Sequence, residues 1–222
     1  MKAHKNEIQR AYCRIPRNFP TCYISRRFGY NGGDLSQGNT ATALLANAIA
    51  TGATLYVIIT IFGPISGAHF NPVVTLAMFL RRQISSRKSI AYVVFQILGG
   101  ICGTAVAHMM FELPVLQFST TARTGLSQYF SELIATFGLL LTILFGVKHK
   151  IEAVPTLVAL YITAAYWFTA STSFANPSVT IARTFSDTFS GINYNDTGIF
   201  IVAQILGAVF ALILYDLLDK DA

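Results

Sequence analysis

The chain has 222 residues, of which 53% are hydrophobic and 12% charged, and its formal net charge is +6. Soluble domains carry about twice that share of charged residues, so the composition excludes an ordinary soluble domain and favours an integral membrane protein. The net charge does not indicate a nucleic-acid partner, because the basic residues cluster at the ends of apolar blocks, where cytoplasmic loops hold Lys and Arg.

The first segment in chain order, residues 11–34, differs from everything after it. It reads AYCRIPRNFPTCYISRRFGYNGGD and carries four arginines and two prolines. A bilayer-spanning helix needs about 20 mostly apolar residues, and this segment is too charged to be one. The chain therefore divides into an aberrant basic segment at 1–34 and an apolar domain at 35–222.

Five apolar blocks follow that are long enough to span a bilayer: 40–62, 89–111, 127–147, 154–172 and 197–217. Two shorter apolar pieces, 71–80 and 176–185, each begin with Asn-Pro. Pro suits the first turn of a helix because its missing N–H would be unpaired there, and Asn caps the remaining free N–H groups. Both pieces are predicted as half-length helices that begin inside the membrane.

The two short pieces repeat each other. FNPVVTLA at 70–77 matches ANPSVTIA at 175–182, and Gln-Ile-Leu-Gly recurs at 96–99 and 204–207. Such repetition indicates a duplicated unit, and broken helices at matching places in two halves indicate a transport site. The second half holds three long blocks and the first half only two, so a helix is missing where residues 11–34 lie.

A half-helix that begins at the membrane midplane has unpaired N–H groups and a partial positive charge at its N-terminus. Such backbone is tolerated only where it is buried in protein or lines a wet cavity. Two half-helices that enter from opposite faces would bring Asn71 and Asn176 together, with their amides toward a pore. Two positive helix ends in a narrow pore repel cations and interrupt a proton wire.

The two boxes, Asn71-Pro72-Val73 and Asn176-Pro177-Ser178, resemble those of the aquaporin and glycerol-facilitator family. The resemblance covers about 35–218 and implies an all-α, inverted-repeat membrane bundle of six spanning helices with two re-entrant half-helices. This chain has five recognisable spans instead of six. The resemblance also implies a homotetramer in which each protomer has its own pore. The third box residue of the family is usually Ala, and Val73 and Ser178 depart from it while the Asn pair stays intact.

Water-selective and glycerol-selective members of that family usually place Arg three residues after the second Asn, where this chain has Val179. The resemblance implies Thr51 as a second constriction residue. It implies Ala164 as a third, with Thr163 and Ala165 left open. A filter of Thr, Val and a small residue would be wider and less charged than one with Arg and His. It would admit small uncharged solutes beyond water.

Arg183 lies two turns from the cap, and we expect it to be clear of the constriction. The segments 164–173 and 174–192 look most like the bacterial branch of the family that is associated with arsenic resistance. That resemblance implies permeation by neutral arsenite-type hydroxides and by methylated arsenic acids.

Two further residues stand near the boxes. Glu132 is the only acid well inside a spanning block, and intramembrane acids are costly and usually functional. The resemblance implies that Glu132 supports a re-entrant loop by accepting backbone hydrogen bonds; a proton-coupling site is the alternative. His69 precedes the first box and either lines the pore through its backbone carbonyl or has a structural role.

These features favour a passive channel for water and small neutral solutes in a bacterial inner membrane. The alternatives are a coupled secondary transporter that uses Glu132, which would need more membrane-embedded ionisable groups, and a non-functional truncated channel. No Cys–His pair, metal cluster or phosphate loop supports an enzyme, so we expect no cofactor and no metal. The expected partners are the solutes, water, the bilayer and further copies of the chain, with no nucleic acid.

The genetic code suggests an origin for residues 11–34. When each codon is read from its second base, one permitted translation is IVEFLGTFLLATLVVGSGIMAE, an apolar span that echoes ELIATF at 132–137. The basic loops at 81–88 and 148–150 lie inside by the positive-inside rule, and a restored first helix would put the N-terminus inside as well. We therefore expect a frame-shifted first helix, irregular or partly helical as written. A genuine basic extension is the alternative.

Overall fold

The computed structural model describes residues 38–220, and every regular element in this part of the chain is helical. The long helices are α3 (Thr40–Ser66), α5 (Ser86–Met110), α6 (Leu126–His149), α7 (Val154–Phe168) and α9 (Tyr194–Lys220). A single 3-10 turn, η1 (Ile151–Ala153), leads into α7. Within 38–220, five helices are long and apolar enough to cross a membrane, which confirms the five predicted spans. The prediction for residues 1–34 lies outside the described residues.

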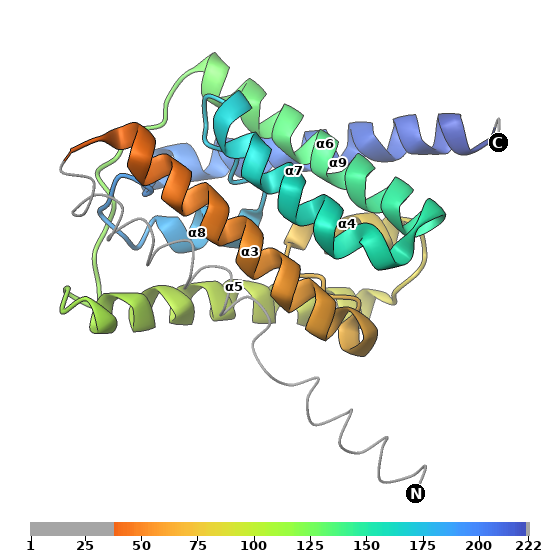
Figure 1. Ribbon diagram of the computed structural model, residues 1–222, viewed down its shortest axis with the longest axis horizontal. Helices are drawn as coiled ribbons and strands as arrows, with labels where there is room; N and C mark the ends of the chain where they lie inside the picture. Colours follow the sequence, from red (N-terminus) through yellow and green to blue (C-terminus); the bar gives the residue numbers. More distant parts are fainter. Residues whose placement is uncertain (1–37, 221–222) are drawn as a thin grey trace, which may run out of the picture.

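The two Asn-Pro pieces form short helices as predicted. They are α4 (Pro72–Leu80) and α8 (Pro177–Arg183), with Asn71 and Asn176 as their N-caps and a proline in the first turn of each. Both short helices contact α5, α9 and each other. In Figure 1 the long helices run in roughly the same direction across the view, and α4 and α8 lie among them. The beginnings of the two short helices therefore meet inside the bundle.

Several helix ends differ from the sequence prediction, and those of α3, α7 and α8 lie near the two boxes. Helix α3 continues to Ser66 and stops where Gly67 adopts φ 76°, a left-handed conformation that glycine adopts readily. Helix α7 ends at Phe168 rather than at residue 172, because an irregular loop leads from Thr169 to the second box. Helix α8 ends at Arg183, two residues earlier than predicted.

Among the described helices, α6 and α9 share the most extensive contact. A Cβ atom on Gly207 of α9 would overlap the Leu133 carbonyl oxygen of α6 and would lie 3.1 Å from the Phe137 nitrogen. Gly207 ends the second Gln-Ile-Leu-Gly motif, so the repeated glycine has a packing reason in this half of the chain.

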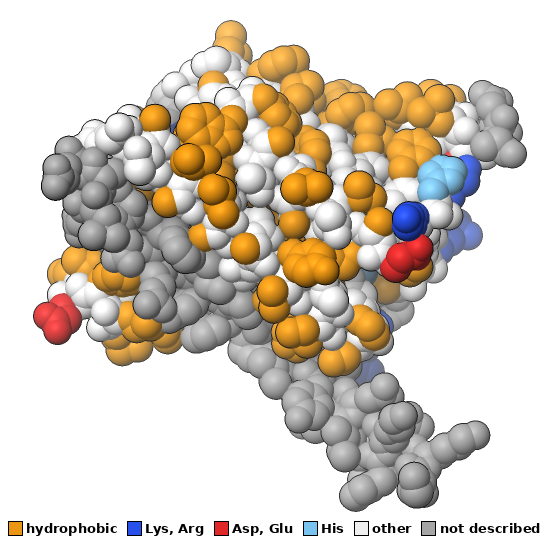
Figure 2. Space-filling view, viewed as in Figure 1, with side chains coloured by type: hydrophobic (Ala, Val, Ile, Leu, Met, Phe, Trp, Pro, Cys, Tyr) orange, Lys and Arg blue, Asp and Glu red, His pale blue; other side chains and the backbone are white. Residues whose placement is uncertain are grey.

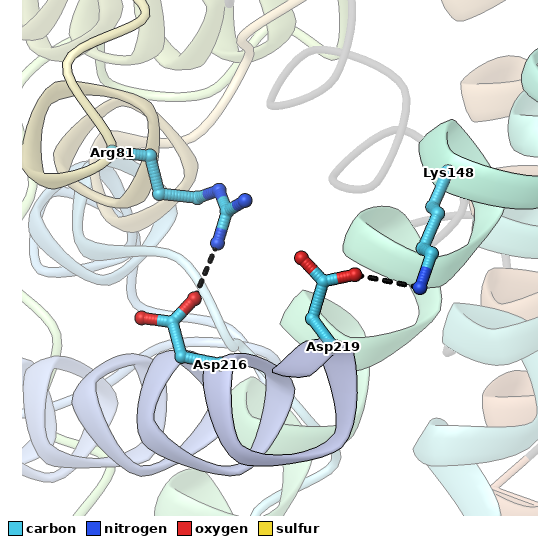
Figure 3. A network of polar contacts seen from close by, with 4 residues as sticks. All are labelled: Arg81, Lys148, Asp216 and Asp219. Carbon is cyan, nitrogen blue, oxygen red and sulfur yellow. Dashed lines mark hydrogen bonds and ion pairs between the residues drawn. The ribbon is translucent and has the colours of Figure 1, made fainter. Parts of the chain in front are cut away.

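Two ion pairs lie at the end of α9 (Figure 3). Arg81, directly after α4, pairs with Asp216 at 2.6 Å, and Lys148 of α6 pairs with Asp219 at 2.6 Å. The Arg81 guanidinium also lies 4.5 Å from the centre of the Tyr215 ring. Both loops that the positive-inside rule assigns to the cytoplasm thus meet the end of α9 at the same end of the molecule.

The surface over α3 and α7 is largely apolar, and charged side chains gather mainly at one edge of the view (Figure 2). Large exposed apolar side chains on these helices include Ile49, Ile61 and Leu160. A soluble protein rarely exposes so extended an apolar surface, whereas lipid tails solvate it without cost.

Candidate pore and selectivity site

The two Asn-Pro boxes hold each other in place. The Asn71 side chain accepts a hydrogen bond from the Val73 nitrogen at 3.1 Å, and its amide donates to the Ala175 carbonyl at 2.6 Å. Asn176 mirrors this arrangement, since its side chain caps α8 at Ser178 and its amide donates to the Phe70 carbonyl at 3.0 Å. Each amide group carries two N–H bonds, and both side chains also line the central cavity described below.

The glutamines of the repeated Gln-Ile-Leu-Gly motifs, one on α5 and one on α9, form hydrogen bonds to the same two boxes. The Gln96 amide donates to the Thr75 hydroxyl at 2.9 Å, and the Gln204 amide donates to the Thr180 hydroxyl at 2.9 Å. Both threonines belong to the shared Val-Thr part of the two boxes. The repetition of these glutamines was visible in the sequence, but their partners were not, because 21 to 24 residues separate each pair.

Glu132 supports the loop before the second box. Its side chain is fully buried in α6, and its two oxygens accept hydrogen bonds from the Phe174 and Ala175 nitrogens, both at 2.8 Å. The Ser171 hydroxyl and the Gln204 amide also donate to it, each at 2.6 Å. These contacts are those expected of a loop support.

The loops before both boxes contain residues with unfavourable backbone geometry. Thr172, Ser173 and Ala175 have φ values of 60°, 50° and 46°, and Ala68 before the first box has φ 49°. Left-handed conformations cost non-glycine residues of the order of 1 kcal/mol or more and persist only where surrounding contacts fix them. Glu132 supplies several such contacts in the second loop.

His69 is not one of the described residues that line the central cavity. Its backbone carbonyl accepts a hydrogen bond from the Gln96 amide, and its ring packs edge-to-face on Tyr92 with 5.6 Å between ring centres. Of the two roles left open for His69, these contacts favour the structural one, in which His69 connects the first box to α5.

A cavity of about 110 Å³ opens beside the paired boxes, between α3, α6 and α7. About 15 Å³ of such volume admits one water, so the cavity can hold several waters or a small solute. Most of its lining is apolar and includes Val179. The described polar side chains that line it are Thr51, Asn71, Tyr166, Ser173, Asn176 and Arg183.

The expected filter residues are only partly brought together. Thr51 and Val179 line the cavity with both box asparagines, but Ala164 lies on the exposed side of α7. Tyr166 and Ile162 line the cavity from α7 instead. Residues on one helix face recur every three or four positions. Ala164 is assigned by counting along the chain relative to the second box, and an error of two residues in that count selects the opposite face of α7.

The two residues left open beside Ala164 do not replace it. Thr163 donates a hydrogen bond to the Ala159 carbonyl at 2.8 Å and faces Gly52 of α3, where the two helices meet. Ala165 is fully buried and is not among the described lining residues. Among the α7 residues that line the cavity, Tyr166 is the polar one.

Arg183 contradicts the expectation that it lies clear of the constriction. It is only 3% exposed, lines the cavity, and donates a hydrogen bond to the Tyr166 hydroxyl at 3.3 Å. Its guanidinium carbon lies 4.1 Å from the centre of the Phe174 ring. Two helical turns separate Arg183 from Asn176, so both lie on the same face of α8, and the long Arg side chain reaches the cavity from there.

A second arginine, Arg123, also packs on the Phe174 ring. The Arg123 guanidinium lies 4.8 Å from the centre of the Phe174 ring and donates hydrogen bonds to the carbonyls of Ser171, Phe189 and Gly191. Burial, followed by the nearby charge of Arg183, lowers the pKa of Arg123 to about 10. That value is well above neutral pH, so Arg123 remains a cation.

This fold and site define an integral membrane protein in which two inverted half-helices meet beside a central cavity. The family model described as "Major intrinsic protein" matches residues 25–215. The chain therefore belongs to the major intrinsic protein family.

Individual relatives agree with this assignment. The chain is 56% identical over 181 residues to the aquaglyceroporin AqpS of Rhizobium meliloti (strain 1021), which covers 82% of this chain and 78% of that protein. It is 32% identical over 179 residues to rat aquaporin-4, of which it spans only 54%. The X-ray structure of the aquaglyceroporin from Plasmodium falciparum matches with a TM-score of 0.70 at 22% identity, over 90% of this chain and 91% of that one, which supports the fold.

Proposed function

We propose that the chain forms a passive channel for water and small uncharged solutes of the glycerol class. The observation that carries the proposal is the central cavity, which both box asparagines line together with a mostly apolar wall. A solute that leaves water for such a wall needs a few well-placed donors, and the asparagine amides supply them. The aquaglyceroporin name of the 56% identical relative supports the same solute class.

The coupled-transporter alternative receives no support from Glu132. The side chain is fully buried, and four donors from the loop and from α9 occupy its two oxygens. A proton-coupling carboxylate must exchange protons with the transport path, whereas these contacts fit a fixed carboxylate that supports a loop.

We extend the proposal to further solutes, to the membrane that holds the channel and to its assembly. Because Val179 is shorter than an arginine and adds no second charge beside Arg183, we include neutral arsenite-type hydroxides and methylated arsenic acids among the permeant solutes. We also propose a bacterial inner membrane as the location of this multi-pass chain, which the rhizobial relative supports. The apolar outer face suits both lipid and assembly into a homotetramer.

Flux through reconstituted protein tests the proposal, with Asn176→Leu as the inactive comparison. Proteoliposomes should pass water and glycerol faster than empty vesicles, in proportion to the gradient and without dependence on a pH gradient. Asn176→Leu removes the amide that faces the cavity and bonds Phe70, so flux should fall about tenfold or more. Arsenite uptake measured in the same vesicles tests the finer solute proposal.

Two results would contradict the channel. Wild-type vesicles that pass solutes no faster than lipid alone exclude it, provided that the protein is inserted. Uptake that saturates at low solute concentration and requires a pH gradient would instead establish the coupled transporter.

A further inference from the structure

A chain of hydrogen bonds crosses the wall of the cavity. The Thr51 hydroxyl of α3 lies 3.3 Å from the Tyr166 hydroxyl of α7, and Arg183 of α8 donates to that same hydroxyl at 3.3 Å. All three side chains line the cavity and are buried. Three separate helices thus contribute one connected polar strip to an otherwise mostly apolar wall.

The guanidinium of Arg183 is fixed in position from two directions. The Tyr166 hydroxyl holds one of its nitrogens, and the Phe174 ring lies 4.1 Å from its central carbon. Phe174 is itself held, because its backbone nitrogen donates to Glu132 at 2.8 Å and Arg123 packs on its ring. A cation that is fixed in this way presents its donors to the cavity in one geometry, which a flexible surface arginine would not do.

We infer that Arg183, and not a residue at position 179, supplies the cationic hydrogen-bond donor of the selectivity filter, and that Tyr166 is its positioning residue. The inference rests on the proposed channel function and specifies its filter. The solutes it favours are small uncharged molecules whose hydroxyl oxygens accept hydrogen bonds from the guanidinium.

The physical reason lies in the cost of a charge at this depth. A charged side chain inside a membrane protein is costly unless it meets an aqueous path or paired groups, and it usually marks a transport route. Hydrogen bonds from an ionised donor are about twice as strong as neutral ones, so a solute that lacks the matching oxygen loses the advantage. Val179 lies one turn earlier on the same α8 face and lines the same cavity, and its side chain is much shorter than that of an arginine.

A pair of solutes that differ by one hydroxyl group tests the inference directly. The permeabilities of glycerol and propane-1,2-diol are measured in proteoliposomes, each corrected for empty vesicles. Arg183→Met removes the charge and the donors while keeping a long side chain, so the glycerol-to-propanediol ratio should fall about threefold to tenfold. Arg183→Lys keeps the charge and should retain most of the ratio.

Two further variants separate positioning from general stability. Tyr166→Phe removes only the hydroxyl that holds Arg183 and should lower the ratio in the same direction, by less than Arg183→Met. Arg87→Met makes the same chemical change at an exposed position near the start of α5 and should leave the ratio unchanged.

An unchanged ratio in a conducting Arg183→Met variant overturns the inference. If Arg183→Met conducts nothing, Tyr166→Phe decides: a lowered ratio supports the inference, and a wild-type ratio refutes it. A wild-type chain without flux above empty vesicles rejects the channel itself, which is a different result, because no ratio is then defined.

Discussion

At the scale of single residues, the cavity brings together two side chains that lie one helical turn apart on α8. Val179 is 7% exposed and apolar, and Arg183 is 3% exposed and charged. The usual family arrangement places an arginine at the first of these positions, whereas this chain carries its buried arginine at the second. Position 179 therefore carries a short side chain, while the guanidinium of Arg183 still lines the same cavity.

We predict that Val179→Arg lowers glycerol permeation more than water permeation, by about fivefold in their ratio. A second guanidinium narrows the cavity and adds donors, and a change of one hydrogen bond is worth ~1 kcal/mol. Stopped-flow light scattering on proteoliposomes measures both permeabilities. Val147→Arg, at the exposed end of α6 next to Lys148, is the matched control. Equal loss for all solutes would remove Val179 from the filter.

Like charges at i and i+4 on a helix repel. A double variant, Val179→Arg with Arg183→Val, moves the cation by one turn without adding a charge. It should express and insert better than Val179→Arg alone while keeping the narrowed solute range. The amount of folded protein recovered in detergent, compared between the two variants, checks this expectation.

At the scale of whole elements, α6 and α9 share the most extensive contact among the described helices. Their approach depends on Gly207, where a side chain would meet backbone atoms of Leu133 and Phe137. Backbone cannot move aside as a flexible side chain can, so the two helices would have to separate.

Gly207→Ala should lower stability by about 1–3 kcal/mol, the usual cost of overpacking. Thermal unfolding of the detergent-solubilised protein, followed by the loss of its monodisperse peak in gel filtration, measures the effect as a lower apparent Tm. Gly198→Ala lies on the same helix with nothing within 4 Å of the added carbon and should leave the Tm unchanged or slightly higher. The same Tm for both variants would show that α6 and α9 tolerate separation.

At the scale of the whole molecule, the number of spanning helices determines on which side each end of the chain lies. The end of α9 pairs with Arg81 and Lys148 at the basic end, which the positive-inside rule assigns to the cytoplasm. Counting back over the five described spans puts the start of α3 on the opposite side. The seven Lys and Arg residues before Thr40 would then lie outside, against the positive-inside rule.

We therefore propose that residues 11–34 stand in place of a first spanning helix. A variant in which IVEFLGTFLLATLVVGSGIMAE replaces that segment should insert with its N-terminus inside and conduct more water per protein than the chain as written. Flux in proteoliposomes and protease accessibility of an N-terminal tag measure the two effects. Equal flux from both chains, together with an uninterrupted reading frame in the resequenced gene, would refute the proposal.

The sequence by itself determined the local elements and their duplication. Apolar length predicted the five spans, and Asn-Pro predicted the starts of α4 and α8, because capping and helix length depend on residues adjacent in the chain. The matched boxes also predicted that Asn71 and Asn176 would meet, since the repeat places them at equivalent points of two inverted halves.

Only the tertiary structure decided which side chains share the cavity. Tyr166 lines it in place of Ala164, because a helix turns by about 100° per residue and a count along the chain does not determine its rotation. Arg183 reaches it because a long side chain can extend beyond its own turn toward a hydroxyl on another helix. Pairings such as Gln204 with Thr180 and Glu132 with Ala175 depend on how distant helices pack, and local sequence does not encode that arrangement.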